Sequence, residues 1–250
     1  MRSLAVSLVL IMGWAGAGCG GGKAQPIDEV VLCDRSSSAG ICNEEVARSA
    51  GEAFLGSNPP PGSRFVVLIV GCGVEDVMRS YEIKVPDRWG RGAVRKRRRW
   101  QEEERRRLAT LALPAVNQCS AVAAGIWRAA RVVAERPNSI RRLVIISDLR
   151  EVDRSLGINF ERRVATAADF VGRLRKAREL TDLSGIQLVV CGVHDRATPD
   201  APTWTARKAQ QLRLAWTGAF AAMGVSDLRL TESCDFGSLR NTIAVAQEGR

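Results

Sequence analysis

Short apolar runs that alternate with segments of helical pattern constrain this fold more than any other feature of the sequence. The runs cover residues 27–33, 65–70, 143–146 and 186–193, and a last, shorter one covers 228–230. Only Asp28 and Glu29 interrupt the first run. Strands that are apolar at consecutive positions are buried on both faces, as in parallel sheets covered by helices. The sequence therefore predicts an α/β fold with three layers, doubly wound around a mainly parallel sheet.

The segments between the runs predict the covering helices and one further strand. We expect helices over residues 39–55, 117–135, 161–180, 203–223 and 238–247, because their apolar positions recur at helical spacing or a turn signal opens them. Residues 81–85 alternate between apolar and polar, which is typical of an antiparallel edge strand. Residues 87–113 are densely charged and predict a solvated helical insertion.

The first residues of the chain have the pattern of an export signal. Met1-Arg2 is followed by an apolar run at 4–12, small residues at 13–18 and then Cys19. This pattern predicts a signal peptide over 1–18, a lipidated Cys19 with a linker over 19–26, and one domain over 27–250. Bacterial lipoproteins usually carry Leu where this chain has Gly16, so plain cleavage near Ala17 stays open. We expect a lipid-anchored protein on the outer membrane facing the periplasm, or otherwise a soluble periplasmic or secreted one.

Cysteine usage agrees with export. The chain has seven Cys, and six remain when Cys19 is set aside. An even number in an exported chain predicts disulfides, although the pairing cannot be deduced from the sequence. Buried free thiols are the alternative for Cys33, Cys72 and Cys191, which lie in or beside apolar runs. The six other Cys are Cys33, Cys42, Cys72, Cys119, Cys191 and Cys234.

Two of the apolar runs end at an acidic residue. Asp34 follows the first run and Asp148 follows the run at 143–146, while Ser36 and Ser38 place hydroxyls at alternate positions after Asp34. The carboxyl ends of parallel strands meet at one edge of the sheet, where ligands bind. Carboxylates and hydroxyls together form an all-oxygen site for a hard cation. The alternative is that the serines only cap the next helix and that Asp34 bonds to nearby amides.

These residues resemble the metal-ion-dependent adhesion site of the von Willebrand factor A family. Its Asp-x-Ser-x-Ser motif matches Asp34-Arg35-Ser36-Ser37-Ser38, and its Asp after the fourth strand matches Asp148. Ser120 stands where the family has Thr, and Leu149 follows Asp148 where many relatives have Gly. The resemblance covers residues 27–247. It implies a site for Mg²⁺, with Mn²⁺ or Ca²⁺ as alternatives, formed by Asp34, Ser36, Ser38, Ser120 and Asp148.

The same resemblance implies a function. We expect a cation-dependent, non-enzymatic module that binds a partner protein, with a Glu or Asp of the partner completing the coordination of the ion. One alternative is a metal-free scaffold in an envelope assembly. Another is an enzyme, either a metal-dependent hydrolase or one that uses the His194-Asp195 pair for acid–base chemistry.

The net charge of +10 raises the question of a polyanionic partner. Basic residues 95–99, flanked by Trp89 and Trp100, could bind nucleic acid or lipid phosphate, but acidic residues 102–104 follow directly. We therefore interpret the segment as a solvated helix and expect no nucleic-acid partner. A glycine pattern at residues 71–73 lacks the third glycine of a nucleotide-binding loop. The oligomeric state stays open.

Overall fold

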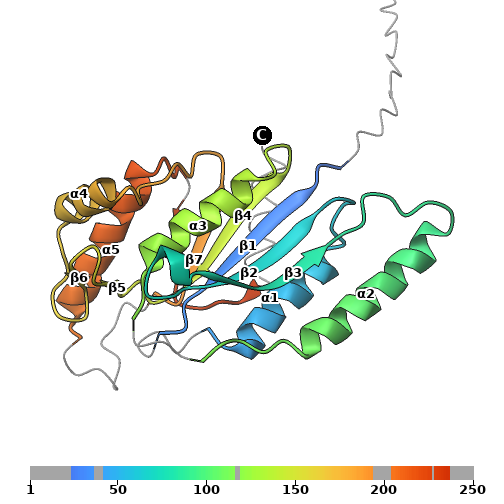
Figure 1. Cartoon of the computed structure of the whole chain (residues 1–250), viewed down its shortest axis with the longest axis horizontal. Coiled ribbons are helices and arrows are strands. Elements are labelled where there is room, and N and C mark those ends of the chain that lie inside the picture. The colour runs from blue at the N-terminus through green and yellow to red at the C-terminus, as the bar shows by residue number, and fades with distance from the viewer. Residues whose placement is uncertain (1–23, 37–41, 116–118, 194–203, 227, 237–250) are drawn as a thin grey trace, which may run out of the picture.

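The computed structural model describes residues 24–36, 42–115, 119–193, 204–226 and 228–236, which form an α/β sheet structure. Figure 1 shows six strands side by side in the order β3-β2-β1-β4-β7-β8. Only β3 runs antiparallel to its neighbour. The strands are β1 (Ile27–Cys33), β2 (Arg64–Ile69), β3 (Met78–Lys84), β4 (Ile140–Ile146), β7 (Gln187–Cys191) and β8 (Leu228–Thr231). The predicted mainly parallel sheet with an antiparallel edge strand is confirmed.

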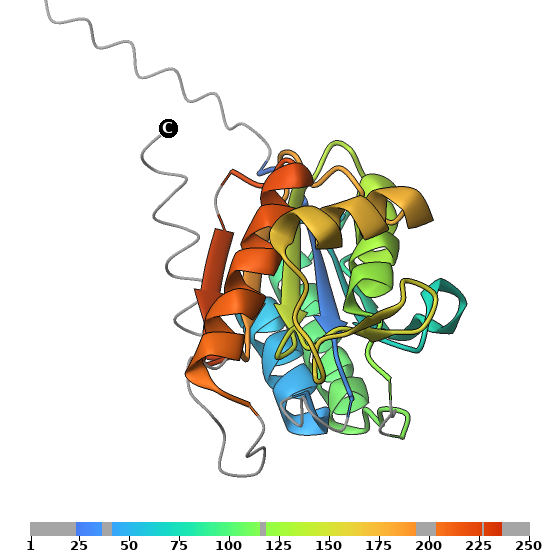
Figure 2. The same ribbon diagram turned by 90° about the vertical axis from the view of Figure 1, so that its left-hand side faces the viewer.

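Helices cover both faces of this sheet (Figures 1 and 2). Val30 and Leu32 of β1 face a core shared with α3, α4 and α5, whereas Val31 faces a second core shared with α1 and α2. Successive residues of a strand point to opposite faces, so a fully apolar strand serves both cores at once. The helices are α1 (Glu44–Gly56), α2 (Ala93–Ala109), α3 (Val122–Ala134), α4 (Ala167–Ala177) and α5 (Ala206–Ala222).

Several element boundaries differ from the sequence prediction. Helix α1 begins at Glu44 and not near residue 39, because the side chain of Asn43 accepts a hydrogen bond from the Val46 amide and caps the helix there. Strand β4 begins at Ile140, so it includes the polar pair Arg141-Arg142 that the apolar pattern excluded. Likewise β3 starts at Met78, and α5 starts after Trp204.

Three short elements were missed, and one expected helix lies outside the described residues. Strands β5 (Val152–Asp153) and β6 (Ile158–Asn159) form a small hairpin after β4, and η1 (Val74–Asp76) is a single 3₁₀ turn after β2. Such short pieces carry no periodicity that a sequence pattern could reveal. The helix predicted over 238–247 falls in the part of the chain that is not described. In the described parts, no helix has the length and apolar character needed to cross a membrane.

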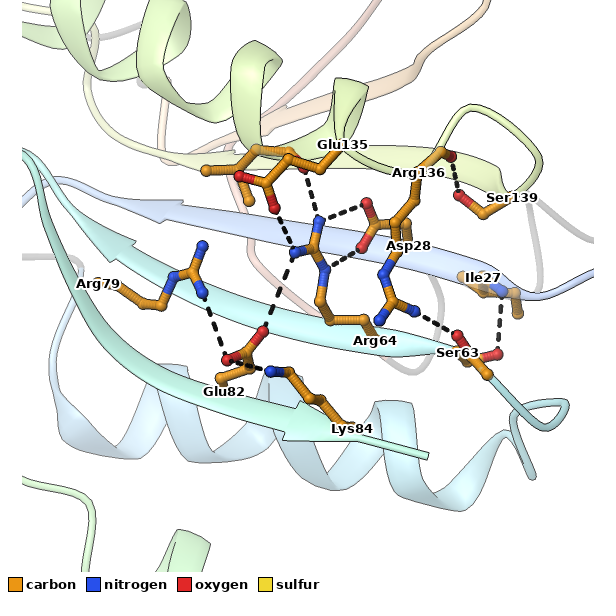
Figure 3. Close-up of polar contacts among 12 residues, drawn as sticks. Ile27, Asp28, Ser63, Arg64, Arg79, Glu82, Lys84, Glu135, Arg136 and Ser139 are labelled. Atoms are coloured by element: carbon orange, nitrogen blue, oxygen red, sulfur yellow. Dashed lines mark hydrogen bonds and ion pairs between the residues drawn. The ribbon is translucent and has the colours of Figure 1, made fainter. Parts of the chain in front are cut away.

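A buried ion pair explains the acidic interruption of the first strand. Nε and Nη2 of Arg64 on β2 lie 2.7 and 2.8 Å from the two carboxylate oxygens of Asp28 on β1 (Figure 3). Nη1 of Arg64 reaches Glu135 at 2.7 Å, and Nη2 also donates to the carbonyl of Val132 at the end of α3. Burial alone would lower the pKa of Arg64, but these bonds raise it above its ordinary value. The cluster joins β1, β2 and α3.

Breaking this cluster is expected to destabilise the protein strongly. Arg64→Met removes the guanidinium. Asp28, which is 0% exposed, would then be a buried charge without its ion-pair partner. We expect the free energy of unfolding, measured by urea denaturation, to fall by about 3–5 kcal/mol. Arg99→Met is the matched control, because Arg99 pairs with Glu103 on the surface, where loss of an ion pair costs at most ~1 kcal/mol. Equal losses in the two variants would contradict this account.

Candidate metal centre

The carboxylate of Asp34 lies at the centre of the carboxyl edge of the sheet. Its backbone continues β1, since the Asp34 amide donates to the carbonyl of Ile146 at 2.9 Å. Its side chain accepts three hydrogen bonds, which come from the Ser36 amide at 2.9 Å and from the hydroxyls of Ser120 at 2.8 Å and Ser147 at 2.7 Å. Asp34 is 0% exposed. One buried carboxylate thus draws together three separate segments of the chain.

Ser120 reaches this point because its segment is fixed on both sides. The Ala121 amide donates to the carbonyl of Gly71 after β2, and Ser120 forms an isolated antiparallel bridge with Val152. Helix α3 begins directly afterwards, at Val122. The loop before the helix is therefore held between β2 and the hairpin that follows β4, which aims the hydroxyl of Ser120 at Asp34.

Asp148 brings a second buried carboxylate to the site. It follows Ser147 at the end of β4 and is 5% exposed. Its Oδ1 accepts a hydrogen bond from the Arg150 amide at 3.0 Å, whereas its buried Oδ2 has no hydrogen-bond partner among the described residues. The nearest cation is Nε of Arg150, at 3.3 Å from Oδ2. Burial, with a further contribution from the charge of Asp34, raises the pKa of Asp148 to about 6.

The residue after Asp148 has a backbone conformation that favours glycine. Leu149 has φ of 61°, in the left-handed region, where a non-glycine residue costs about 1–2 kcal/mol. Its side chain is completely buried in the core of α3, α4 and α5. Its carbonyl accepts a hydrogen bond from Nε1 of Trp216 at 2.8 Å, and its amide donates to the hydroxyl of Ser147. These contacts offset the strain and hold Asp148 and Ser147 in place.

Arg150 adds a fixed positive charge beside the carboxylates. Its guanidinium carbon lies 4.2 Å from the ring centroid of Trp204, a stacking distance, and its side chain is largely buried. Arginine stacked on an aromatic ring and paired with a carboxylate loses much of its freedom to move. The site therefore holds two carboxylates and one cation, arranged around serine hydroxyls.

Three disulfides surround the site, so the free-thiol alternative for the buried cysteines is wrong. They join Cys33 with Cys42, Cys72 with Cys119, and Cys191 with Cys234. Cys33 immediately precedes Asp34, and Cys119 immediately precedes Ser120. The bridges therefore tie down the loops that carry the site residues, and they indicate an oxidising compartment outside the cytoplasm.

The structure brings together four of the five site residues that the sequence predicted, since Asp34, Ser36, Ser120 and Asp148 all lie at this edge. Ser38, Cys19 and His194 fall outside the described residues. The suggestion that residues 36–38 cap the following helix does not hold for Ser36, because Asn43 caps α1.

Sequence reasoning missed Ser147 and Arg150. Ser147 stands directly before Asp148, and the one available signal was a polar residue at the end of an apolar run, next to the strand that ends in Asp34. Arg150 gave no signal of its own, because its partner Trp204 is 54 positions away along the chain.

The residues present fit a hard divalent cation. Within the described ranges no three His, Cys, Asp or Glu side chains form a metal-ligating group, so the ligands here would be two carboxylates supplemented by hydroxyls. Oδ2 of Asp148 is a buried carboxylate oxygen without a hydrogen bond, and Arg150 at 3.3 Å is its one nearby cation among the described residues, so it still has lone pairs to offer an ion. Mg²⁺ prefers oxygen ligands and keeps several waters, so one or two carboxylates are sufficient to hold it.

A group of further buried acids lies behind the site. Oε2 of Glu151 accepts a hydrogen bond from the Ala123 amide in the first turn of α3, where the helix dipole favours an anion. Complete burial nevertheless raises the pKa of Glu151 well above its ordinary value. Burial and the nearby charge of Asp153 raise the pKa of Glu179 to about 7. One oxygen of each of these three acids has no hydrogen-bond partner among the described residues.

Fold and site together define an α/β domain that presents carboxylates and hydroxyls at the carboxyl edge of a parallel sheet. No protein-family model and no curated protein matches the sequence. Several solved structures are similar to it at low identity. An aerotolerance-related membrane protein from Bacteroides fragilis is 12% identical with a TM-score of 0.46, and the match covers 87% of this chain and 96% of that one.

Two further similar structures are larger proteins. The pilus adhesin SpaC from Lactobacillus rhamnosus GG is 12% identical with a TM-score of 0.49, over 88% of this chain and 30% of the adhesin. A von Willebrand factor type A protein from Catenulispora acidiphila is 14% identical with a TM-score of 0.39, over 80% of this chain and 42% of that one. This chain thus spans less than half the length of either protein.

The raised pKa of Glu179 predicts how stability depends on pH. The pKa is about 7 in the folded protein and 4.5 in the reference state, so folding favours the protonated acid. Its stabilising contribution is complete below pH 4.5 and is lost as the pH rises through 7. We expect urea denaturation to show that Glu179→Gln loses less stability than wild type between pH 5 and pH 8. Glu102→Gln changes an exposed acid on α2 and should follow the wild-type curve of stability against pH. If both variants changed this pH dependence equally, the assignment to Glu179 would be contradicted.

Proposed function

We propose that this protein is a von Willebrand factor A-type module that binds a partner protein through a divalent cation. The observation that carries the proposal is the convergence of Asp34, Ser36, Ser120 and Asp148 at one sheet edge, with Oδ2 of Asp148 buried and without a hydrogen bond. Hard cations prefer such oxygen ligands. The proposal is for binding and assigns no catalytic residue.

Asp34 and the hydroxyls of Ser36 and Ser120 are the residues that would hold the ion, with Asp148 acting directly or through water. Ser38 completes this set in the family motif. A serine hydroxyl that donates its proton to Asp34, as Ser120 does, still has lone pairs to offer a cation. We propose Mg²⁺ as the ion, with Mn²⁺ or Ca²⁺ as alternatives.

The charge balance of the site determines what the bound ion would attract. Two carboxylates offset the two charges of the cation, and Arg150 adds one more positive charge at 3.3 Å from Asp148. The occupied site would then be positive overall, and it would supply an open coordination position for a carboxylate. We therefore propose that the partner protein offers a Glu or Asp side chain to this site.

Calorimetric titration of Mg²⁺ and Mn²⁺ into the full chain tests the metal site. We expect saturable binding by wild type and at least ~10-fold weaker binding by Asp34→Asn, which keeps the shape of the side chain but removes its charge. Asp169→Asn is the matched control, since Asp169 is an exposed acid on α4, and it should bind the ions as wild type does. Identical titrations of wild type and Asp34→Asn would show that no ion binds at this edge.

A metal-free scaffold is the second candidate, and one observation favours it. Three donors already satisfy the carboxylate of Asp34, so the loop is held together without an ion. The two functions differ in how a partner responds to a chelator. A scaffold would retain its partner, whereas a cation-dependent module would release it.

We further propose that the chain is exported and anchored through a lipid on Cys19, on the outer membrane facing the periplasm. The three disulfides support an oxidising compartment. Secretion or a soluble periplasmic form is the alternative, since Gly16 departs from the usual lipoprotein pattern.

Detergent phase separation of cells that express the full chain tests this anchor. Because an acyl chain adds about 0.8 kcal/mol of membrane affinity for each buried methylene, we expect the wild type in the detergent phase with an added mass of lipid. Cys19→Ser should carry no lipid. An unlipidated wild type that begins after Ala17 would instead support plain cleavage.

A further inference from the structure

The amino-terminal end of α2 carries a concentrated positive charge. Residues 87–99 contain seven basic residues and one acidic residue, a net charge of +6 in a chain whose total is +10. Residues 100–113 contain three Glu and three Arg and are neutral. The acidic residues that follow the basic run therefore balance the second half of α2 in number, and the first half keeps most of its charge.

The contacts within α2 have the same asymmetry. Glu103 pairs with Arg99 at 3.0 Å, Glu104 pairs with Arg107 at 2.7 Å, and Arg105 reaches Glu52 on α1. Toward the start of the helix, Arg97 donates to backbone carbonyls at residues 58 and 59. Five other side chains there are exposed and make no ion pair or side-chain hydrogen bond with any described residue: Arg88, Arg91, Arg95, Lys96 and Arg98. We call these five residues, with Val94, the basic tip.

The basic tip is costly to the isolated helix. No acidic residue lies in the first turn of α2, and Gly92 provides no side-chain cap. Positive side chains near a helix amino terminus oppose the helix dipole, and these ones also repel each other. Val94 is 84% exposed among them. A surface that concentrates like charges, free helix amides and one apolar side chain is suited to a dense layer of anions.

The basic tip also lies at a defined end of the molecule. Figure 1 shows the start of α2 at the same end as the start of β1, opposite the carboxyl edge that holds the candidate metal centre. Contacts support this placement, because Gly62 lies between Asp87, which precedes α2, and Pro26, which precedes β1. A methyl group in place of the Gly62 hydrogen would lie 3.2 Å from Oδ1 of Asp87 and 3.7 Å from Cγ of Pro26. Cys19 precedes Pro26 by seven positions, a reach of about 25 Å for an extended chain. The basic tip therefore faces the side from which the chain enters the domain.

We propose that the basic tip docks against an anionic lipid bilayer. The disulfides indicate an oxidising compartment outside the cytoplasm, which favours an anionic lipid surface over nucleic acid as the extended polyanion. Each basic residue near such a surface strengthens binding, and the attraction acts within a Debye length. Docking orients the domain with its basic tip on the lipid and its carboxyl edge turned away from it. The inference depends on neither lipidation of Cys19 nor occupancy of the metal site.

Co-sedimentation of the full Cys19→Ser chain with vesicles tests this proposal without an acyl anchor. The readout is the partition coefficient on vesicles of 3:1 phosphatidylcholine:phosphatidylglycerol divided by that on pure phosphatidylcholine. Apolar residues 4–12 contribute to binding of both kinds of vesicle, so their contribution cancels in this ratio. We expect a strong preference for the anionic vesicles that weakens as salt rises. Arg91→Gln, Arg95→Gln, Lys96→Gln and Arg98→Gln together should reduce the ratio on the order of 100-fold.

The matched control removes the same charges elsewhere on the surface. Arg162→Gln, Arg163→Gln, Arg175→Gln and Lys176→Gln also replace three Arg and one Lys, all exposed. This control should change the ratio only a few-fold. Arg95→Glu is a second variant that keeps the helix folded, because it places an acid in the first turn, where the helix dipole favours it. It too should lower the ratio.

Three results would overturn the proposal. Equal losses in the two quadruple variants would mean that net charge alone drives binding. Release from the vesicles by inorganic phosphate at constant ionic strength would indicate a discrete anion site. Binding to double-stranded DNA that exceeds vesicle binding, and that depends on the same four residues, would make the basic tip a nucleic-acid surface.

Discussion

The structure depends on the position of β1 between two parallel neighbours. Its backbone pairs with β2 on one side and β4 on the other, and its side chains enter both cores. A strand placed in this way has one end free for polar chemistry, the carboxyl end, where the pairing stops and the next loop begins. Asp34 occupies that position. Since β4 ends beside it, the residues after β4 deliver Ser147 and Asp148 to the same point, and the segment before α3, which is bonded to Gly71 after β2, delivers Ser120.

The disulfides add order where the sheet no longer supplies it. Beyond the last strand residue the chain loses its ladder of hydrogen bonds, and loop positions become free to move. Cross-links of this kind typically contribute about 2–4 kcal/mol by restricting the unfolded chain. Here two of them fall on the residue immediately before a site residue, Cys33 before Asp34 and Cys119 before Ser120. Pre-ordered ligands lose little freedom when an ion binds, which favours metal affinity.

The sequence predicts what local pattern controls and fails where distant contacts decide. Apolar runs of strand length established the parallel sheet, and a polar residue at the end of such a run identified Asp34 and Asp148. Ser120 was found only through a family resemblance. Ser147 and Arg150 were missed because their roles depend on Asp34 and Trp204, which are remote along the chain. The start of α1 was misplaced because Asn43 competes successfully with the earlier serines as a cap. The cysteine pairing could not be read from spacing, since each partner is fixed by the loops around the sheet edge.

Strand direction finally gives the molecule two chemically different ends. All parallel strands enter from the side of residue 26 and leave at the carboxyl edge, so buried carboxylates collect at one end. The buried pair of Asp28 and Arg64 lies toward the entry side and contributes no net charge there. The excess positive charge at the entry end comes instead from the start of α2, where no acidic residue lies in the first turn. A domain tethered from its entry end, or held there by an anionic surface, necessarily presents the carboxyl edge outward. This arrangement turns the edge that holds Asp34 and its companions away from the point of attachment, and it follows from the direction of the parallel strands.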